Sequence, residues 1–295
     1  MSMALVSDLE RLHDQWFWRD FAPDLHVVDV AFLTPQTVFA IDAAGIENGR
    51  ALLRREGYFE IPPPDWGLPI ADMAALVARL DEAGLPAPFS FMYDEFWCLF
   101  VRLNRILEGV LGQGFFRLPD FWAWIVRPDR MDSGWQPHRD KTFPTALFDD
   151  GSPKSVTIWI PLTDSTPLNG CIYIVPADRD PTYNTPHEKE WRFAHPDIRA
   201  LPAPAGTILC WNQAVLHWGS HACGRETAPR ISVAFEFQSA GAAPFNQPLT
   251  NPNVIPEFDF RVRLVAKQIL QYKHMYPLAP AIERMADEIV ARPQH

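Results

Sequence analysis

Apolar residues recur at helical spacing at both ends of the chain, whereas the middle contains short runs of aromatic and β-branched residues. The helical period predicts helices over residues 43–55, 70–83, 93–111, 260–275 and 281–291. Residues 58–61 predict a short strand, which three prolines end. The helices at the two ends are therefore expected to flank a domain whose centre is built from strands.

The central runs lie between loops rich in Pro, Gly, Asn and Asp, and each is short enough for one strand. They cover residues 121–126, 155–162, 171–175, 206–211 and 231–237. No helix-length segment alternates with them, which argues against a parallel α/β sheet. The pattern predicts a mainly β fold with antiparallel strands: a double-stranded β-helix, that is, a jelly-roll or cupin-like barrel, buttressed by the N- and C-terminal helices.

Length and proline distribution favour one domain. The chain has 295 residues, 47% of them hydrophobic, and its 29 prolines are spread over many loops and are not gathered in one linker. We expect a single domain over residues 1–295, with a helical N-terminal part (1–114), a jelly-roll core (115–240) and a helical C-terminal extension (241–295).

Charge and cysteine content narrow the possible partners. The formal net charge is −10 and no basic cluster offsets it, which argues against a nucleic acid or an anionic membrane surface as partner.

The four cysteines show no Cys-x-x-Cys spacing, so neither a disulfide framework nor a zinc knuckle is expected. Residues 1–16 are charged and amphipathic, without an apolar signal core, and no run of 18 apolar residues occurs; we therefore expect a cytoplasmic protein. Composition does not indicate an oligomeric state.

The first candidate chemistry is a histidine and a carboxylate two positions apart, His138 and Asp140. In an extended strand both side chains project to the same side, about 7 Å apart along the backbone. An imidazole with a carboxylate suits iron, manganese or zinc. An isolated His-x-Asp is also common in solvated turns, so the hypothesis depends on a third ligand.

Four histidines after Asp140 are candidates for that ligand: His187, His195, His217 and His221. The first two lie in a long polar loop, residues 177–199, where exposure to solvent is expected. His217 instead follows the strand-like run that begins at Gly206 and a turn, which predicts a position at the end of a core strand. His217 is therefore the preferred third ligand.

Arg230 opens the last strand-like run, thirteen positions after His217, and Ser232 points to the same side. A buried arginine needs an anion, and its fork binds a carboxylate through two hydrogen bonds. Taken alone, Arg230 is more typical of a surface salt bridge.

The combined pattern of His138, Asp140, His217 and Arg230 resembles the phytanoyl-CoA dioxygenase-like branch of the Fe(II)/2-oxoglutarate-dependent oxygenases. The resemblance covers roughly residues 115–240 and extends to the stretches Val156-Thr157-Ile158-Trp159-Ile160-Pro161-Leu162, Asn169-Gly170-Cys171, Val175-Pro176 and Gly206-Thr207. The chain departs from the family at Arg139, where a glutamine is more usual, and at Gly219, where a serine is common.

The resemblance implies a mechanism. His138, Asp140 and His217 would hold Fe(II), and 2-oxoglutarate would chelate the metal, with its far carboxylate on Arg230 and Ser232 or Thr157. Thr157 and Trp159 share one strand face, which we expect to face the co-substrate, although Trp159 also suits core packing. With O2, such an enzyme hydroxylates an unactivated C–H bond of a small molecule, such as an amino acid, carboxylic acid or secondary metabolite, and releases succinate and CO2. Asp140 favours hydroxylation over halogenation, because related halogenases lack that carboxylate.

Candidate substrate contacts are Arg139, Lys141 and Trp218. The two cations flank Asp140 at the opposite parity, so exposure to solvent is an alternative for both. The loop 177–199 carries Trp191 and suits a lid that is disordered before substrate binds.

Two other classes remain open at this stage. One is a zinc-dependent hydrolase that uses the same three ligands and an activated water, and the other is a non-catalytic jelly-roll binding protein. Within the oxygenase class, desaturation, ring formation and epimerisation are alternatives to hydroxylation.

Overall fold

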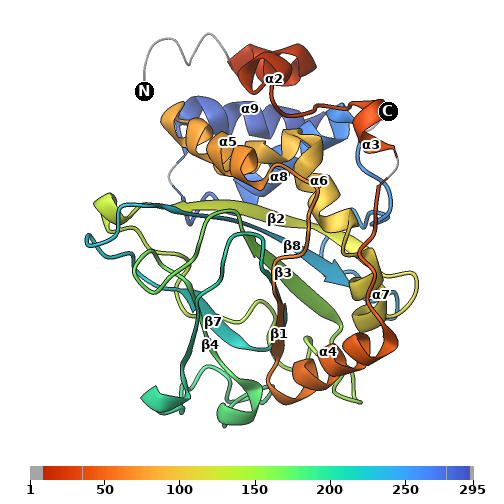
Figure 1. The fold of residues 1–295 in the computed structure, drawn as a ribbon, viewed down its shortest axis with the longest axis vertical. Coiled ribbons are helices and arrows are strands. Elements are labelled where there is room, and N and C mark those ends of the chain that lie inside the picture. Colours follow the sequence, from red (N-terminus) through yellow and green to blue (C-terminus); the bar gives the residue numbers. More distant parts are fainter. Residues whose placement is uncertain (1–8, 35, 277, 293–295) are drawn as a thin grey trace.

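Helices cover one face of a large antiparallel sheet, and a smaller sheet lies on the other side (Figure 1). The computed structural model describes residues 9–34, 36–276 and 278–292. Residues 1–8 of the amphipathic stretch predicted over residues 1–16 lie outside the described residues. No helix in the described part of the chain is long and apolar enough to cross a membrane.

The large sheet has five strands in the order β1-β6-β3-β8-β2, and the small sheet has three in the order β5-β4-β7. All pairs are antiparallel. The strands are β1 (Tyr58–Ile61), β2 (Phe116–Val126), β3 (Ser155–Pro161), β4 (Ile172–Val175), β5 (Arg199–Leu201), β6 (Ile208–Asn212), β7 (Leu216–Gly219) and β8 (Arg230–Gln238). The mainly β prediction with flanking helices is confirmed. Within the described residues the two sheets remain separate, as in a sandwich, and do not close into a continuous barrel.

Strand β8 shows how the sequence divides the large sheet into two faces. Ile231, Val233, Phe235 and Phe237 belong to the large core beneath the helices, whereas Ala234 packs with the cluster between the sheets. This alternation follows from the period of two along a strand. The polar residues at even positions of β8 consequently face the space between the two sheets.

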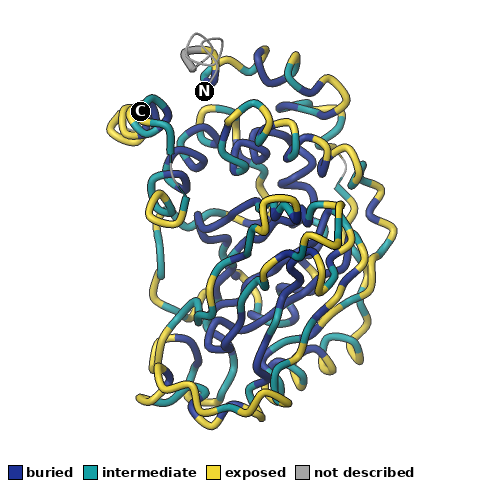
Figure 2. The backbone as a smooth tube through the Cα atoms, turned by 90° about the vertical axis from the view of Figure 1, so that its left-hand side faces the viewer, coloured by how far each residue is buried: buried dark blue, intermediate teal, exposed yellow. Residues whose placement is uncertain are grey.

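The helices are α2 (Gln15–Phe21), α3 (Val30–Leu33), α4 (Ala43–Arg55), α5 (Ile70–Glu82), α6 (Asp94–Val101), α7 (Asn104–Leu111), α8 (Phe258–Gln271) and α9 (Pro280–Ala291). Of these, α5 and α8 pack against β2, whereas α4 packs against β1 at the other edge of the large sheet (Figure 1). A fully buried ion pair between Asp94 and Arg261, 2.6 Å long, connects α6 to α8. Figure 2 shows that buried residues are concentrated in these helices and in the central strands.

Two predicted elements differ from the observed ones. The helix predicted over residues 93–111 is divided into α6 and α7, because the carbonyl oxygen of Arg102 accepts from the N–H of Phe39. Strand β2 begins before the predicted residue 121, and it accommodates Pro119 through a register shift between Arg117 and Phe121.

Candidate functional site

His138, Asp140 and His217 converge between the two sheets. Their ligand atoms lie within 4.8 Å of one another. Asp140 Oδ1 is 3.3 Å from Nε2 of His138 and 3.6 Å from Nε2 of His217. His217 follows strand β6 and the turn after Asn212, and it lies on β7 of the small sheet.

The hydrogen bonds of the two imidazoles orient their Nε2 atoms toward the carboxylate. Nδ1 of His138 lies 2.7 Å from the carbonyl oxygen of Gln136, and Nδ1 of His217 lies 3.1 Å from that of Val215. A carbonyl only accepts, so each Nδ1 carries the proton and each Nε2 of a neutral ring presents a lone pair. Nε2 of His138 is buried without a hydrogen-bond partner among the described residues. Two lone pairs facing a carboxylate repel one another unless a cation lies between them, so these residues fit a divalent metal.

Asp140 is held by neighbours that leave Oδ1 directed at the histidines. Its Oδ2 accepts from the Thr157 hydroxyl at 2.8 Å and from the indole N–H of Trp211 at 3.0 Å. Gln213 donates to the Thr157 hydroxyl at 3.1 Å, and the Ser155 hydroxyl donates to Gln213. This chain of hydrogen bonds fixes the orientation of the carboxylate before any ligand binds.

Burial and charge set the protonation of the three residues. Burial alone would raise the pKa of Asp140, but the neighbouring imidazoles outweigh it and hold that pKa well below its usual range. Burial lowers the pKa of His217 to about 4. For His138, burial lowers the pKa, but the carboxylate of Asp140, 3.3 Å away, outweighs this and raises it overall. Asp140 is therefore ionised and His217 neutral near pH 7, the states in which both bind metals.

Arg230 is a buried cation at the edge of the same space, with 1% of its surface exposed. It donates to the Ser232 hydroxyl at 3.0 Å and lies 5.6 Å from the ring centroid of Trp159. Its Nε has no hydrogen-bond partner, and no carboxylate among the described residues forms an ion pair with it. Burial lowers the pKa of Arg230 to about 10, which leaves the guanidinium charged at neutral pH. A buried charge without a counter-ion is costly, so this residue is arranged to receive an anion.

Two glycines leave room beside that guanidinium. A Cβ on Gly134 would lie 2.6 Å from the Cα of Gly219 and 3.2 Å from Nη2 of Arg230. A Cβ on Gly219 would lie 2.7 Å from the Cα of Gly134. The departure from the family at position 219 thus has a steric reason, because the two backbones are too close for a side chain at either position.

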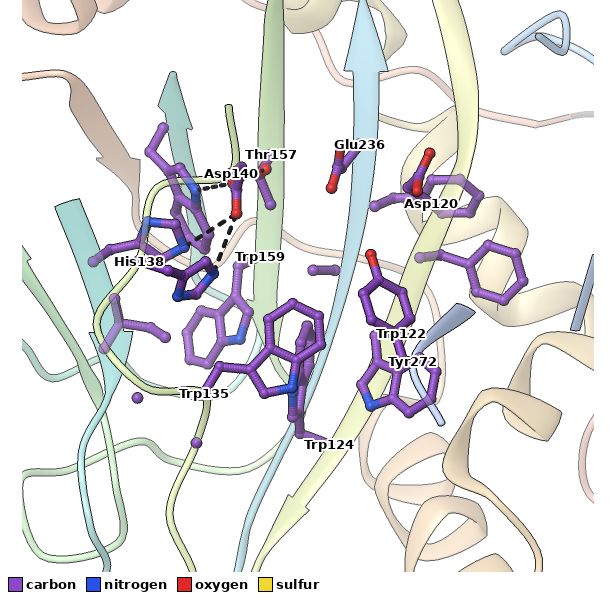
Figure 3. A pocket seen from close by; sticks show the side chains of 18 of the residues that line it. Asp120, Trp122, Trp124, Trp135, His138, Asp140, Thr157, Trp159, Glu236 and Tyr272 are labelled. Carbon is purple, nitrogen blue, oxygen red and sulfur yellow. Dashed lines mark hydrogen bonds and ion pairs between the residues drawn. The ribbon is translucent and has the colours of Figure 1, made fainter. Parts of the chain in front are cut away.

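A pocket contains both the histidine–aspartate cluster and Arg230. Figure 3 shows His138, Asp140 and Thr157 along its wall. Its walls come from β2, β3, β6 and β8 of the large sheet, β4 and β7 of the small sheet, the segment before Asp140, and Tyr272 after α8. Besides these charged residues, it is lined by Asp120, Phe121, Trp122, Trp124, Gly134, Trp135, Thr157, Trp159, Ile172, Trp211, Gly219, Ala234, Phe235, Glu236 and Tyr272. Both Thr157 and Trp159 line it, as their shared strand face predicts.

The three candidate substrate residues make other contacts. Arg139 is neither exposed nor directed into the pocket: its guanidinium donates to the carbonyl of Ala214 at 2.6 Å and to Asp180 at 2.5 Å, and both side chains of the ion pair are almost fully buried. Lys141 forms an ion pair with Glu236 at 3.2 Å. Trp218 stacks on Tyr173, with ring centroids 5.8 Å apart, and is not among the residues that line the pocket.

The segment 177–199 is anchored through the Arg139 ion pair. Asp180, Thr182 and Glu188 are buried within it, whereas Trp191 is 54% exposed. The carboxylate of Asp180 also accepts from the backbone N–H of Thr182. This anchoring differs from the predicted disorder, because buried polar groups at several points attach the segment to the core.

Sequence reasoning did not identify Trp211, Gln213, Asp120, Glu236 and Tyr272 as site residues. Glu236 had a signal, since it shares the parity of Arg230 and Ser232 along β8. The others lie on strands or turns whose pairing brings them to the pocket, which a single sequence does not reveal.

The sequence of residues 100–224 matches the family model described as phytanoyl-CoA dioxygenase. Over these residues the chain is similar to that family. The match includes all three residues of the histidine–aspartate cluster, and Arg230 and Tyr272 lie beyond it. A search of curated protein sequences finds no match.

Several solved structures share the fold of this chain at low sequence identity. The α-ketoglutarate-dependent epimerase SnoN from nogalamycin biosynthesis is 21% identical, with a TM-score of 0.52 over 72% of this chain and 95% of that one. A second SnoN structure, in complex with Fe3+, α-ketoglutarate and nogalamycin RO, has a TM-score of 0.53 at 20% identity over 72% and 89% of the chains. Apo HygX from Streptomyces hygroscopicus is 16% identical, with a TM-score of 0.52 over 68% and 90% of the chains. These similarities support the fold.

Proposed function

We propose that this protein is a non-heme Fe(II)/2-oxoglutarate-dependent dioxygenase that hydroxylates an unactivated C–H bond of a small molecule. The observation that carries the proposal is Arg230, a buried guanidinium without a counter-ion in the same pocket as the His138, Asp140 and His217 cluster. A single metal site could serve many reactions. A metal site beside an arginine without a counter-ion can bind a co-substrate that chelates the metal and carries a second carboxylate.

In this assignment His138, Asp140 and His217 hold Fe(II), and Arg230 with Ser232 holds the far carboxylate of 2-oxoglutarate. When bound, iron and 2-oxoglutarate supply the oxidising chemistry, in which O2 is consumed and succinate and CO2 are released. The space beside Gly134 and Gly219 leaves the guanidinium accessible to that carboxylate.

The remaining residues position these groups and exclude water. Thr157 and Trp211 fix Asp140 through its Oδ2. This role for Thr157 accounts for its hydroxyl without a direct contact to the co-substrate. Trp159, Trp124 and Trp135 line the pocket with apolar surface, which limits access of water to the reacting C–H bond.

An anaerobic titration of the apoprotein with Fe(II) and then 2-oxoglutarate tests the assignment. We expect the weak visible charge-transfer band of the chelate in the wild type, its loss in His217→Ala, and a Kd for 2-oxoglutarate raised at least ten-fold in Arg230→Ala. Tight zinc binding without any such band, and an Arg230→Ala variant with unchanged affinity, would instead favour the zinc-dependent hydrolase. Iron binding without turnover of 2-oxoglutarate in the presence of any substrate would favour a binding protein.

The reaction outcome is tested separately once a substrate is found. Hydroxylation requires a product 16 Da heavier than the substrate, with the added oxygen derived from O2. A product of unchanged mass would indicate epimerisation, and a product lighter by two hydrogens would indicate desaturation or ring formation. Either result would support the assignment of Fe(II) and 2-oxoglutarate and contradict hydroxylation.

A further inference from the structure

The face of β8 that points toward the small sheet carries a positive residue, Arg230, at one end and a negative residue, Glu236, near the other. Arg230, Ser232, Ala234 and Glu236 share this face, and three of them, Arg230, Ala234 and Glu236, line the pocket. Glu236 lies six positions after Arg230 on the strand, so the two Cα atoms are about 20 Å apart. The pocket therefore has a positive end, assigned above to the co-substrate, and a second end of opposite charge.

Two carboxylates lie at that second end. Asp120 on β2 and Glu236 on β8 both line the pocket, and Figure 3 shows them on the far side of Thr157 from the imidazole of His138. Thr157 is the β3 residue directly opposite Glu236 in the sheet, so this end is adjacent to Asp140 and hence to the metal site. A substrate group held there would place its neighbouring carbons close to the metal.

Only one of these two carboxylates forms an ion pair with a basic residue among the described residues. Lys141 pairs with Glu236 at 3.2 Å. Asp120 accepts from the amide groups of Asn246, at 2.8 and 2.9 Å, and of Gln271, at 2.7 Å. Among the described residues, no lysine or arginine lies within ion-pair distance of Asp120, and Lys267 near it donates to Asn246 and Gln247 instead. Asp120 therefore has only neutral amide partners, and this end of the pocket holds two carboxylates and one ion-paired lysine among the described residues.

Aromatic rings line the pocket from the carboxylates toward Arg230, with Trp124 opposite Ser232 in the sheet. Trp122, Trp124, Trp135 and Tyr272 line the pocket, with ring centroids 5.0 Å apart for Trp122 and Tyr272, 5.0 Å for Trp135 and Tyr272, and 5.3 Å for Trp124 and Trp135. In Figure 3 the Tyr272 hydroxyl points from this wall toward Asp120 and Glu236. The faces of indole and phenol rings attract cations, and they do so most strongly where water is excluded.

We propose that this end of the pocket selects substrates that carry a positively charged nitrogen, with Asp120 and Glu236 as the charge partners and Trp122, Trp124, Trp135 and Tyr272 as the enclosing rings. The inference rests on the proposed function in that the cation anchors the substrate of the oxygenase. It makes Asp120, Glu236 and Tyr272 residues that determine specificity. Glu236 and Tyr272 lie beyond residues 100–224, whereas Asp120 and the three tryptophans lie within the region that matches the family model.

Pairs of ligands that have the same shape but differ in charge test the proposal. Calorimetric titrations of the full chain compare choline with 3,3-dimethylbutan-1-ol, and butylammonium with butan-1-ol. The titrations are made anaerobically with Fe(II) and 2-oxoglutarate present, and again without them. We expect at least one cation to bind ten-fold or more tightly than its neutral partner. Equal binding within both pairs would overturn the proposal.

Variants then locate the effect. Asp120→Asn is expected to weaken binding of the preferred cation at least five-fold, while binding of its neutral partner changes less than two-fold. Because the new amide would face the donors of Asn246 and Gln271, Glu236→Gln serves as a second variant should Asp120→Asn fail to fold. Asp149→Asn removes an exposed carboxylate and is the matched control, with no expected effect. A cation preference that survives in both pocket variants would place the cation elsewhere and overturn the assignment to these residues.

This test and the test of the proposed function fail independently. The charge-transfer band reports co-substrate binding at the Arg230 end, whereas the difference within each ligand pair reports the acidic end. A preference for cations without the charge-transfer band would support the cation site and overturn the oxygenase proposal. The band without a preference for cations would support the oxygenase proposal and overturn the cation site.

Discussion

His138 and His217 lie directly opposite each other, and each donates its backbone N–H to the carbonyl oxygen of the other at 3.0 Å. Residues 79 positions apart in the sequence are thereby joined before any side chain takes part. Their imidazole centroids lie 4.4 Å apart as a result. Because the main chain forms this pair, the spacing of the two rings does not depend on a bound metal, and substitution of one ring should leave the backbone pair intact.

Metal binding should therefore stabilise the folded protein, and this effect should require both rings. At a free metal concentration 100 times Kd, the expected gain is about 2.7 kcal/mol in the free energy of unfolding. Thermal unfolding with and without Fe(II) or Mn(II), under anaerobic conditions, measures it. We expect His217→Ala to lose most of this gain, whereas His221→Ala, which removes an exposed ring, retains it. An equal gain in His217→Ala would show that the metal binds elsewhere.

Thr157→Val should weaken metal binding by removing the hydroxyl that donates to Asp140 at 2.8 Å. Loss of such a supporting hydrogen bond costs about 10- to 100-fold in metal affinity. Thr157→Ser keeps the donor and should recover most of the affinity, which separates the hydrogen bond from the packing of the methyl group. Competition with a chelating indicator gives the Kd of each protein. Similar affinities for the valine and serine variants would contradict this role.

The histidine–aspartate cluster could be proposed from sequence because residue types and their spacing suggest it. His138 and Asp140 sit two positions apart, and His217 follows a strand-like run in a segment otherwise apolar. The hydrogen-bond partners of Asp140 were not predictable in the same way. Trp211 and Gln213 reach the site because β6 pairs with β3 and the chain turns after Asn212, and these long-range contacts leave no local pattern.

Gly219→Ala should impair binding of 2-oxoglutarate. The added Cβ would lie 2.7 Å from the Cα of Gly134, so the two segments beside Arg230 must separate and the guanidinium must shift. We expect the Kd for 2-oxoglutarate to rise at least ten-fold, with a smaller effect on Fe(II) binding. Gly224→Ala is the control, because its Cβ would meet nothing within 4 Å. A Gly219→Ala variant that binds 2-oxoglutarate as the wild type does would show that the close approach is unimportant for the site.

The two departures from the family illustrate a limit of reading a site from sequence. Arg139 and Gly219 suggested altered contacts with substrate or co-substrate, yet each is explained by a neighbour distant in sequence. Arg139 pairs with Asp180, and Gly219 lies against Gly134. The alternation of side chains along an extended segment predicted that Arg139 points away from the metal ligands. It did not predict the ion pair with the buried carboxylate of Asp180.

Arg139→Ala should release the segment 177–199. The change leaves the buried carboxylate of Asp180 without its cation, which costs about 3–5 kcal/mol in the free energy of unfolding. Faster cleavage within residues 177–199 by a low concentration of protease, detected by mass spectrometry, reports the local release. Arg179→Ala, at an exposed position of the same segment, is expected to cleave at the wild-type rate. Wild-type cleavage in Arg139→Ala would show that other contacts anchor the segment.

The buried pair of Asp94 and Arg261 should dominate the stability of the helical layer. Asp94 also accepts from the backbone N–H groups of Val28 and Asp29, at 3.0 and 2.8 Å, so one carboxylate connects α6, α8 and the segment before α3. Asp94→Asn keeps the shape but leaves the guanidinium uncompensated, and we expect a loss of about 3–5 kcal/mol in urea denaturation. Asp24→Asn, at an exposed position, should change stability by less than about 0.5 kcal/mol. The double variant Asp94→Asn/Arg261→Met removes the buried charge and should regain part of the loss. If the double variant were less stable than Asp94→Asn, the cost would come from the other contacts of Arg261, with the carbonyl oxygens of Met92 and Pro256, and not from its unpaired charge.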